Sequence, residues 1–385
     1  MLLNKSYIIL FSGYSVNNTP KLKNLINSLK KEGFSISLFG IVKDLSHDLV
    51  GVNVTHLYSK GNKQGVFKIA LVCYYVAKLI FSLVFTLRNS NIYAINPISG
   101  LIALIASTLT SKKYIYESHE MVFGLNYPFF RGRWRHFWSF LEKNIIKKSV
   151  YFFTTDEHRL KFIKRYYKIK SDNIGYILNV PTLSMRKGEK EENRKKFNFG
   201  SKFVVSYCGG IMKGRGIESI IEAYANFKNR GANSLLLLAG SIEEDYHDVL
   251  SKIISKLGIS SNQILFTGKL NNSVLMKYMS ASDATFALYN NVSLNNRMCS
   301  PNKVFDALHS KTSLITTNSF LTANIVLENN IGVILKTINS QNILHAIDQC
   351  YEKENIYLTD NQWGELQFKF CWESEFDRVK SHILI

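Results

Sequence analysis

The sequence feature that most constrains the fold is an alternation of short apolar runs with helical patterns. Each run has four or five residues, most of them aliphatic, aromatic or β-branched, as is typical of a buried strand. The runs lie at 7–11, 35–39, 92–95, 114–117 and 150–154 in the first half, and at 204–207, 235–239, 263–267, 284–288 and 314–317 in the second. Strands that alternate with helices pair in parallel βα units, so the sequence predicts an α/β fold with doubly wound parallel sheets.

Length and a local change in composition divide the chain into two domains. A chain of 385 residues is expected to form two domains. Residues 185–196 are rich in Lys, Arg and Glu and interrupt the alternation, which indicates an interdomain linker with a helical part. We therefore expect an N-terminal domain at 1–184, a linker at 185–200 and a C-terminal domain at 201–370.

The charge indicates anionic partners. The formal net charge is +19 and the sequence pI is about 9.5. Such a chain attracts nucleic acid, nucleotide diphosphates or an anionic membrane surface. No helix-turn-helix signature, zinc-finger spacing or aromatic RNA-binding motif is present, so we expect no nucleic acid partner.

Cysteine usage and the N-terminus favour a cytoplasmic location. The five cysteines are widely spaced and form no Cys-x-x-Cys pair, which argues against a disulfide framework or a zinc site. The N-terminus has one lysine and only a short apolar run, so no signal peptide is expected.

A glycine-rich segment in the second half has the pattern of a phosphate site. The strand-like run Val204–Tyr207 is followed by glycines that include Gly209 and Gly210, and a helical pattern begins at Ile217. Glycine permits close backbone approach to a ligand, and a helix N-terminus offers N–H groups to an anion. Lys213 and Arg215 add positive charge. The alternative is an ordinary strand–turn–helix with a solvated basic loop.

A second segment, about ninety residues later, could bind the other end of a nucleotide. Pro301 suits a helix start, and Asn302 and Lys303 follow it. Asp306 lies inside the expected helix, where an acid has poor propensity, and its carboxylate could accept hydrogen bonds from a ribose diol. Alone, Asp306 could also be a surface acid on an amphipathic helix. Together the two segments indicate an enzyme that uses a nucleotide-activated substrate.

These two segments resemble glycosyltransferase family 4, whose members are also called group 1 glycosyltransferases. The resemblance extends through most of the chain, at 7–39, 114–120, 176–181, 204–223, 299–309 and Trp372-Glu373. It implies a retaining enzyme with the GT-B fold, in which two Rossmann-like domains face a central cleft. It further implies that the N-terminal domain faces the acceptor, that the C-terminal domain binds the nucleotide sugar, and that a final helix at 371–385 packs back toward the N-terminal domain.

The resemblance also implies roles for individual residues. His119 corresponds to a histidine near the donor sugar, although it could instead be a structural histidine at a strand end. Arg215 corresponds to a phosphate-binding cation and Asp306 to the acid that binds the ribose. The remaining donor-binding candidates are Gly13, Gly209, Gly210, Lys213, Gly240, Pro301, Asn302 and Lys303.

Two positions depart from the family pattern. Met298 stands where many members have a first acid that contacts the donor sugar. Gly210 stands where many members have an arginine, and Arg215 replaces the usual lysine. Lys213 or Lys303 would then supply the missing cation.

The implied activity is transfer of a sugar from a nucleotide diphosphate to a hydroxyl of a glycan or lipid-linked acceptor, with retention. The chain contains no Asp-x-Asp, so we expect a metal-independent hexosyltransferase. No cofactor is expected besides the donor substrate, a UDP- or GDP-sugar. The usual setting of such chains is bacterial surface polysaccharide, O-antigen or capsule synthesis. The alternatives are a nucleotide-sugar 2-epimerase of GT-B architecture and a non-catalytic, membrane-associated partner in polysaccharide assembly.

Two segments bear on membrane contact. Residues 69–87 are almost wholly apolar, but the central Lys78 favours a buried or membrane-contacting helix over a span. Residues 129–138 interleave arginines with aromatic residues, which suggests contact with phospholipid or a lipid-pyrophosphate acceptor. The alternative for 129–138 is a helix start with solvated arginines. We therefore hypothesise a peripheral position on the inner face of the plasma membrane.

Overall fold

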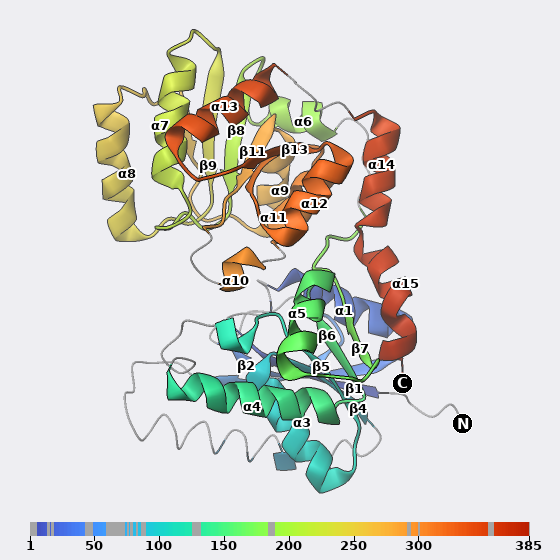
Figure 1. The fold of residues 1–385 in the computed structure, drawn as a ribbon. Helices are drawn as coiled ribbons and strands as arrows, with labels where there is room; N and C mark the ends of the chain where they lie inside the picture. Colours follow the sequence, from blue (N-terminus) through green and yellow to red (C-terminus); the bar gives the residue numbers. More distant parts are fainter. Residues whose placement is uncertain are drawn as a thin grey trace. The chain divides into compact units, whose positions relative to one another are not determined.

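The chain folds into two compact units, drawn in Figure 1. The first comprises Met1–Asn179 and Glu375–Ile385, and the second comprises Val180–Ser374. This computed structural model describes residues 6–13, 16, 19–42, 49–58, 74, 77, 80–81, 84–85, 90–124, 132–183, 189–290, 294–298, 301–352 and 358–384.

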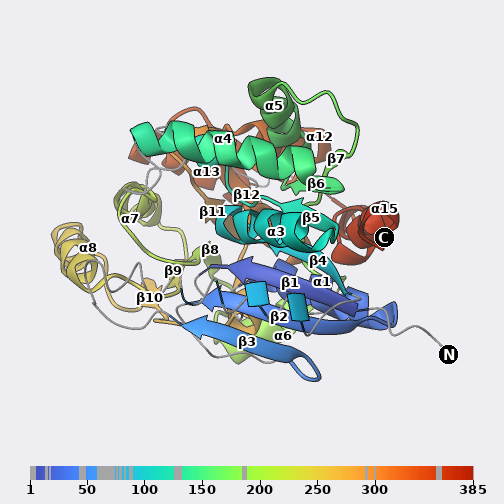
Figure 2. The ribbon, with the colours of Figure 1, turned by 90° about the horizontal axis from the view of Figure 1, so that it is seen from below.

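The first unit is built on a parallel sheet of seven strands in the order β3-β2-β1-β4-β5-β6-β7. The strands are β1 (Ser6–Ser12), β2 (Ser35–Val42), β3 (Asn53–Tyr58), β4 (Ser90–Ile95), β5 (Tyr114–Glu117), β6 (Tyr151–Thr154) and β7 (Ile174–Tyr176). The helices are α1 (Pro20–Lys31), α3 (Pro97–Thr110), the 3₁₀ turn η1 (Val122–Gly124), α4 (Arg133–Lys148), α5 (Glu157–Tyr167) and most of α15 (Trp372–Ile383). Figure 2 shows the strands of this sheet with the helices on both sides.

The second unit is built on a parallel sheet of six strands in the order β10-β9-β8-β11-β12-β13. The strands are β8 (Phe203–Cys208), β9 (Ser234–Ala239), β10 (Ile264–Phe266), β11 (Ala284–Ala287), β12 (Ser313–Thr317) and β13 (Gly332–Leu335). The helices are α6 (Glu189–Lys196), α7 (Ile217–Lys228), α8 (Glu244–Lys256), α9 (Asn272–Ser280), α10 (Leu294–Arg297), α11 (Asn302–His309), α12 (Phe320–Asn329), α13 (Ser340–Tyr351) and α14 (Asp360–Lys369).

Burial on both faces explains why the central strands are continuous apolar runs. All six residues of β9 are buried, and in β8 only Phe203 is partly exposed. A parallel sheet covered by helices on both faces needs such strands. Val205 pairs with Leu236 of β9 and with Ala284 of β11, so β8 lies between them at the centre of the sheet.

The predicted fold class is confirmed: the chain is α/β, with two Rossmann-like parallel sheets. All ten predicted strands are present. Three further strands, β3, β7 and β13, were not predicted, and each lies at an edge of its sheet. β3 and β7 have no continuous apolar run, and the apolar run of β13, Val333–Leu335, has only three residues.

One sequence expectation falls largely outside the described residues, and another falls partly outside them. Of the apolar stretch 69–87, the structure describes 74, 77, 80, 81, 84 and 85, all in helical conformation. Within the described part of the chain, no helix is long and apolar enough to cross a membrane. Of the predicted linker, residues 189–196 form α6, whose Lys190 and Arg194 pair with Asp283 at 3.0 Å each.

Candidate active site

Each sheet reverses its strand order once, and ligands of doubly wound sheets bind at that point, beyond the carboxyl ends of the strands. In the first unit the reversal lies between β1 and β4, and in the second between β8 and β11. Gly13 follows β1, and Gly209 and Gly210 follow β8. Three predicted site residues therefore lie where the topology favours a ligand.

In the second unit, Gly209 and Gly240 let two loops meet at the carboxyl edge of the sheet. Gly240 has φ +142°, and a Cβ atom there would lie 2.1 Å from the carbonyl oxygen of Gly209. The contact is fixed by hydrogen bonds from Gly209 N to Ala239 O and from Ile211 N to Ser241 O, both 2.8 Å. Gly240 is thus required by close backbone packing.

Lys303, from α11, reaches the same place. Its ammonium nitrogen lies 3.7 Å from the ring centroid of Tyr207, a cation–π arrangement. A Cβ atom on Gly209, whose φ is +135°, would lie 2.8 Å from Cε of Lys303. The absence of a side chain at Gly209 therefore makes room for the lysine stem.

A second cation is near enough to perturb Lys303. Burial, followed by the charge of Arg215, lowers the pKa of Lys303 to about 7. Arg215 lies in the loop before α7, with its guanidinium carbon 5.0 Å from the ring centroid of Tyr289. Two cations held together in a half-buried site favour an anionic ligand between them.

The loop that carries Arg215 owes its shape to glycine. Gly214 and Gly216 have φ of +82° and +74°, in the left-handed region. Gly216 is the N-cap of α7 and supplies no side chain to cap the first turn. The N–H groups of that turn are therefore suited to an anion.

Asp306 follows Lys303 by one turn of α11. Burial raises the pKa of Asp306 to about 7, and the charge of Lys303 opposes the rise. Cys208, at the end of β8, is buried, and its pKa is raised to about 12, mainly by burial, with Lys303 and Asp306 acting on it in opposite directions. These effects place Lys303 and Asp306 beside the end of β8.

The other predicted residues of the second unit lie at the start of α11 and in neighbouring loops. Pro301 is the N-cap of α11 and Asn302 is its first residue, so the expected helix start is shifted by one position. Lys213 is exposed in the turn after β8. Met298 follows α10, and its backbone N donates to Leu294 O at 3.0 Å. Cys299 and Ser300 lie outside the described residues.

In the first unit, a buried carboxylate organises the carboxyl edge of β5. Glu117 receives Lys21 Nζ at 2.5 Å, His119 Nε2 at 2.9 Å and the Tyr93 hydroxyl at 2.6 Å. Burial alone would raise the pKa of Glu117, but Lys21 and His119 outweigh it and hold the pKa well below its usual range. Glu117 is thus a charged anchor in the core.

Glu117 also fixes the tautomer of His119. An ionised carboxylate only accepts hydrogen bonds, so Nε2 of His119 carries the proton and donates it. The side chain of His119 is 20% exposed. Its carbonyl oxygen accepts a hydrogen bond from Arg159 Nη1 at 2.5 Å. The backbone and one ring nitrogen of His119 are therefore held.

Asn96 joins His119 to the end of β1. Its Oδ1 accepts from His119 N at 3.4 Å, and its Nδ2 donates to Ser12 O at 2.9 Å. Ser12 precedes Gly13, so the structure brings together the two predicted residues of the first unit. Sequence reasoning assigned no role to Glu117, Lys21 or Asn96. The available signal was a carboxylate inside a buried strand, where an acid needs a partner.

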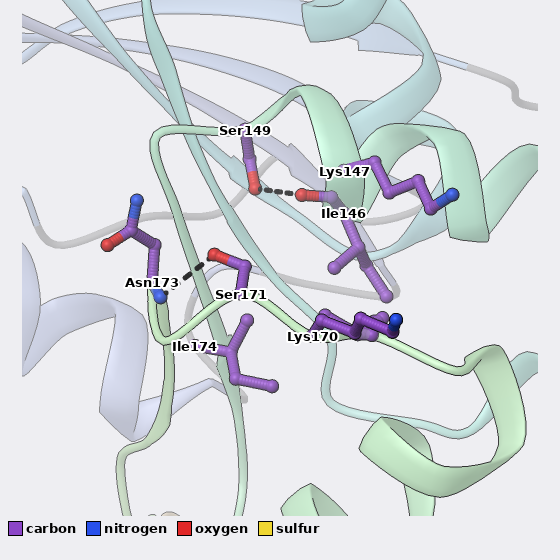
Figure 3. Close-up of a pocket in the computed structure, with 8 residues that line it drawn as sticks. Ile146, Lys147, Ser149, Lys170, Ser171, Asn173 and Ile174 are labelled. Atoms are coloured by element: carbon purple, nitrogen blue, oxygen red, sulfur yellow. Dashed lines mark hydrogen bonds between the residues drawn. The ribbon is translucent and has the colours of Figure 1, made fainter.

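The first unit also contains a recess of about 260 Å³, shown in Figure 3. It is lined by Ile146, Lys147, Ser149, Ile169, Lys170, Ser171, Asn173 and Ile174. Ser149 Oγ donates to Ile146 O at 2.8 Å, and Asn173 N donates to Ser171 Oγ at 3.1 Å. The recess lies at the amino-terminal ends of β6 and β7, the opposite edge from Gly13 and His119, so we do not include it in the candidate active site.

No cluster of three or more His, Cys, Asp or Glu side chains within the described ranges could hold a metal ion.

Comparison with family models finds one match, and it falls in the second unit. Residues 189–367, just under half of the chain, match the model described as glycosyl transferases group 1. The matched range contains every candidate residue of the second unit. The match therefore lies within the second unit.

Relatives by sequence are distant. The chain is 24% identical to the capsular polysaccharide biosynthesis glycosyltransferase CapM of Staphylococcus aureus over 185 residues. The aligned region covers 46% of this chain and 45% of CapM. It is 21% identical to the uncharacterized glycosyltransferase MJ1069 of Methanocaldococcus jannaschii over 272 residues. That aligned region covers 70% of this chain and 67% of MJ1069. The chain thus spans less than half the length of CapM.

Similar solved structures confirm the GT-B fold. Alr3699/HepE of Anabaena in complex with UDP-glucose has a TM-score of 0.73 at 14% identity, over 98% of this chain and 99% of that one. Sucrose-phosphate synthase of Thermosynechococcus elongatus has a TM-score of 0.73 at 13% identity, over 98% of both chains. At these identities the likeness shows the fold.

Proposed function

We propose that the protein transfers a hexose from a nucleotide diphosphate to a hydroxyl of a glycan or lipid-linked acceptor, with retention. The observation that carries the proposal is the convergence of Lys303 and Arg215 beside Gly209 and the start of α7. A diphosphate is the anion that two cations, glycine amides and a helix N-terminus suit best.

In this proposal the second unit binds the leaving group. The bond between the anomeric carbon and the phosphate oxygen breaks, and a bond from that carbon to the acceptor oxygen forms on the same face. The proton of the acceptor hydroxyl passes to a phosphate oxygen of the departing nucleoside diphosphate. Arg215, Lys303 and the first-turn amides of α7 stabilise the developing phosphate charge, without a metal. Asp306 accepts hydrogen bonds from the ribose diol.

We assign His119 to the donor sugar, as the family resemblance implies, with Glu117 as its positioning residue. Glu117 holds Nε2, so Nδ1 is the nitrogen that would meet a sugar hydroxyl. Met298 cannot accept the hydrogen bond that an acid would accept from the sugar. The sugar is then held by fewer side chains of the second unit than in members with that acid.

We infer the nucleotide base of the donor and the kind of polysaccharide synthesis from the similar proteins. Structures of Alr3699/HepE contain UDP and UDP-glucose, which supports a UDP-sugar over a GDP-sugar. The name of CapM, a capsular polysaccharide biosynthesis glycosyltransferase, supports capsular polysaccharide synthesis over O-antigen synthesis.

The first test is a thermal-shift panel with UDP, GDP, dTDP, ADP and CMP. Ligand at about 100 times Kd adds about 2.7 kcal/mol to the stability of the protein, a shift of several degrees. We expect UDP to give the largest shift. If no nucleotide shifts the melting temperature, the proposal is wrong and a non-catalytic role is favoured.

Variants locate the binding. We expect Lys303→Met and Arg215→Ala each to weaken UDP binding tenfold or more, because a hydrogen bond to a charged group contributes about 1.5–3 kcal/mol. Lys252→Met, on exposed α8, is the matched control and should bind UDP normally. Anomeric NMR of the product of a UDP-sugar and an acceptor then separates transfer with retention from inversion, or from epimerisation of the donor.

A further inference from the structure

Helix α4 exposes three large aromatic side chains. The exposed fractions are 53% for Trp134, 48% for Phe137 and 65% for Phe140. The rings of Trp134 and Phe137 are in contact, with centroids 5.8 Å apart. Aromatic residues gathered on one helix are costly to leave in water, and such patches mark interaction surfaces.

The charged side chains on the outer side of this helix are all lysines. Lys147 and Lys148 are exposed, and Lys143 is partly exposed. Glu142, which is the helix's one acid, is 2% exposed. Its carboxylate accepts hydrogen bonds from Tyr116, Ser118 and Tyr167. The outer face of α4, defined by Trp134, Phe137, Phe140, Lys143, Lys147 and Lys148, therefore combines aromatic rings with cations and carries no acid.

The opposite side of α4 explains why this face points outward. Trp138, Ile145 and Ile146 are buried and share the inner side with Glu142. These side chains and Glu142 anchor the helix on the sheet and on α3. Figure 2 shows α4 as a long helix along the outside of the first unit. The aromatic residues are thus exposed on a rigid element.

We propose that the outer face of α4 binds the surface of an anionic phospholipid membrane. Interfacial helices place aromatic residues at the boundary of headgroups and acyl chains, while basic residues pair with anionic headgroups. At the C-terminal end of α4, Lys147 and Lys170 line the recess of Figure 3 and extend the basic surface. The charge of this face fits an anionic lipid surface.

The direction of α4 links this face to the site. The helix connects the parallel strands β5 and β6, so its first turn lies toward the carboxyl edge of the sheet, where His119 lies. The 3₁₀ turn η1, which follows His119, contacts α4. If the proposed function is right, the membrane would hold a lipid-linked acceptor near this edge. Membrane binding itself stands without that function.

Flotation with vesicles tests the proposal. We expect the wild-type protein to float with vesicles of phosphatidylglycerol and phosphatidylcholine and to bind pure phosphatidylcholine at least tenfold more weakly. The triple variant Lys143→Gln/Lys147→Gln/Lys148→Gln should lose tenfold or more, since each cation near an anionic surface contributes about fivefold. The matched control is Lys252→Gln/Lys256→Gln on α8, which should bind like the wild type.

An aromatic variant tests the other half of the face. Phe137→Ser/Phe140→Ser should reduce flotation about tenfold or more. The control is Phe368→Ser on α14, a phenylalanine with a similar exposed fraction of 63%, which should not change flotation. All variants should keep the wild-type thermal shift with UDP, so that loss of membrane binding is separated from loss of folding or nucleotide binding.

Tryptophan fluorescence identifies the helix directly. The chain has four tryptophans, and Trp138, Trp363 and Trp372 are each at most 9% exposed. A blue shift on adding anionic vesicles, with quenching by brominated lipid, should disappear in Trp134→Phe, which should still float. Absence of wild-type flotation, or flotation unchanged by both α4 variants, would overturn the proposal. A third result would also overturn the proposal: a wild-type protein that does not bind vesicles and that light scattering shows to be a dimer, which Phe140→Ser dissociates.

Discussion

Lys303 is the residue whose protonation should respond most directly to a bound nucleotide. Its pKa is lowered to about 7 by burial and by Arg215, so at pH 8 most of the free protein has a neutral lysine. A diphosphate favours the ammonium form and raises that pKa. Binding should therefore be linked to protonation of this side chain.

We predict that UDP binding at pH 8 takes up a substantial fraction of one proton per nucleotide. Calorimetry in two buffers of different ionisation enthalpy measures the uptake. At pH 8 the carboxyl of Asp306, with a pKa of about 7, is already largely ionised, so it contributes little. Lys303→Arg keeps the charge at all pH values and should abolish the uptake. No uptake by the wild-type protein would show that Lys303 does not meet the phosphates.

His119 should act on turnover and not on nucleotide affinity. We expect His119→Ala to reduce kcat with a UDP-sugar at least tenfold while leaving the Kd for UDP unchanged, because Lys303, Arg215 and Asp306 lie in the other unit. His247→Ala, an exposed histidine on α8, is the control and should be fully active. Unchanged turnover in His119→Ala would leave it a structural histidine at a strand end.

At the scale of elements, the loops after β8 and β9 depend on one glycine. We predict that Gly240→Ala lowers the free energy of unfolding by about 2–3 kcal/mol, because the added Cβ meets the backbone of Gly209 at positive φ. Gly258→Ala is a suitable control, since Gly258 also has positive φ but a Cβ atom added there would have no neighbouring atom within 4 Å. Urea unfolding monitored by circular dichroism measures both. Equal losses for the two variants would mean that the close contact is relaxed at little cost.

The same elements show what could be predicted from the sequence. The glycine run after β8 and the Pro-Asn-Lys start of α11 were recognisable because local chemistry defines them. Sequence reasoning assigned the two segments to the two ends of one nucleotide, and the structure places Lys303 of the second segment beside Gly209 of the first. The network of Glu117, Lys21 and Asn96 was not predicted, because it joins residues up to 96 positions apart through burial. The edge strands β3 and β7 were missed because they lack continuous apolar runs, and β13 because its apolar run, Val333–Leu335, has only three residues.

At the scale of the whole molecule, the two units are supported by different observations. The family model matches within the second unit, where the predicted phosphate and ribose residues lie. The first unit is related to known proteins through its fold, and its distinguishing features are the Glu117 network and the outer face of α4. We therefore expect nucleotide binding to depend on the second unit and membrane contact on the first.

The first unit is discontinuous in sequence, and this affects how the protein can fold. Residues from Glu375 onward belong to it: the hydroxyl of Tyr7 in β1 donates to Ile383 O, and Glu375 accepts from Leu178 N at 2.9 Å. During synthesis, these partners are made only after the whole second unit. The second unit can fold as soon as it emerges, whereas the first must wait with part of its core uncovered. The half of the protein that is made first is thus the half that is completed last, and it is there that a chaperone would be needed most.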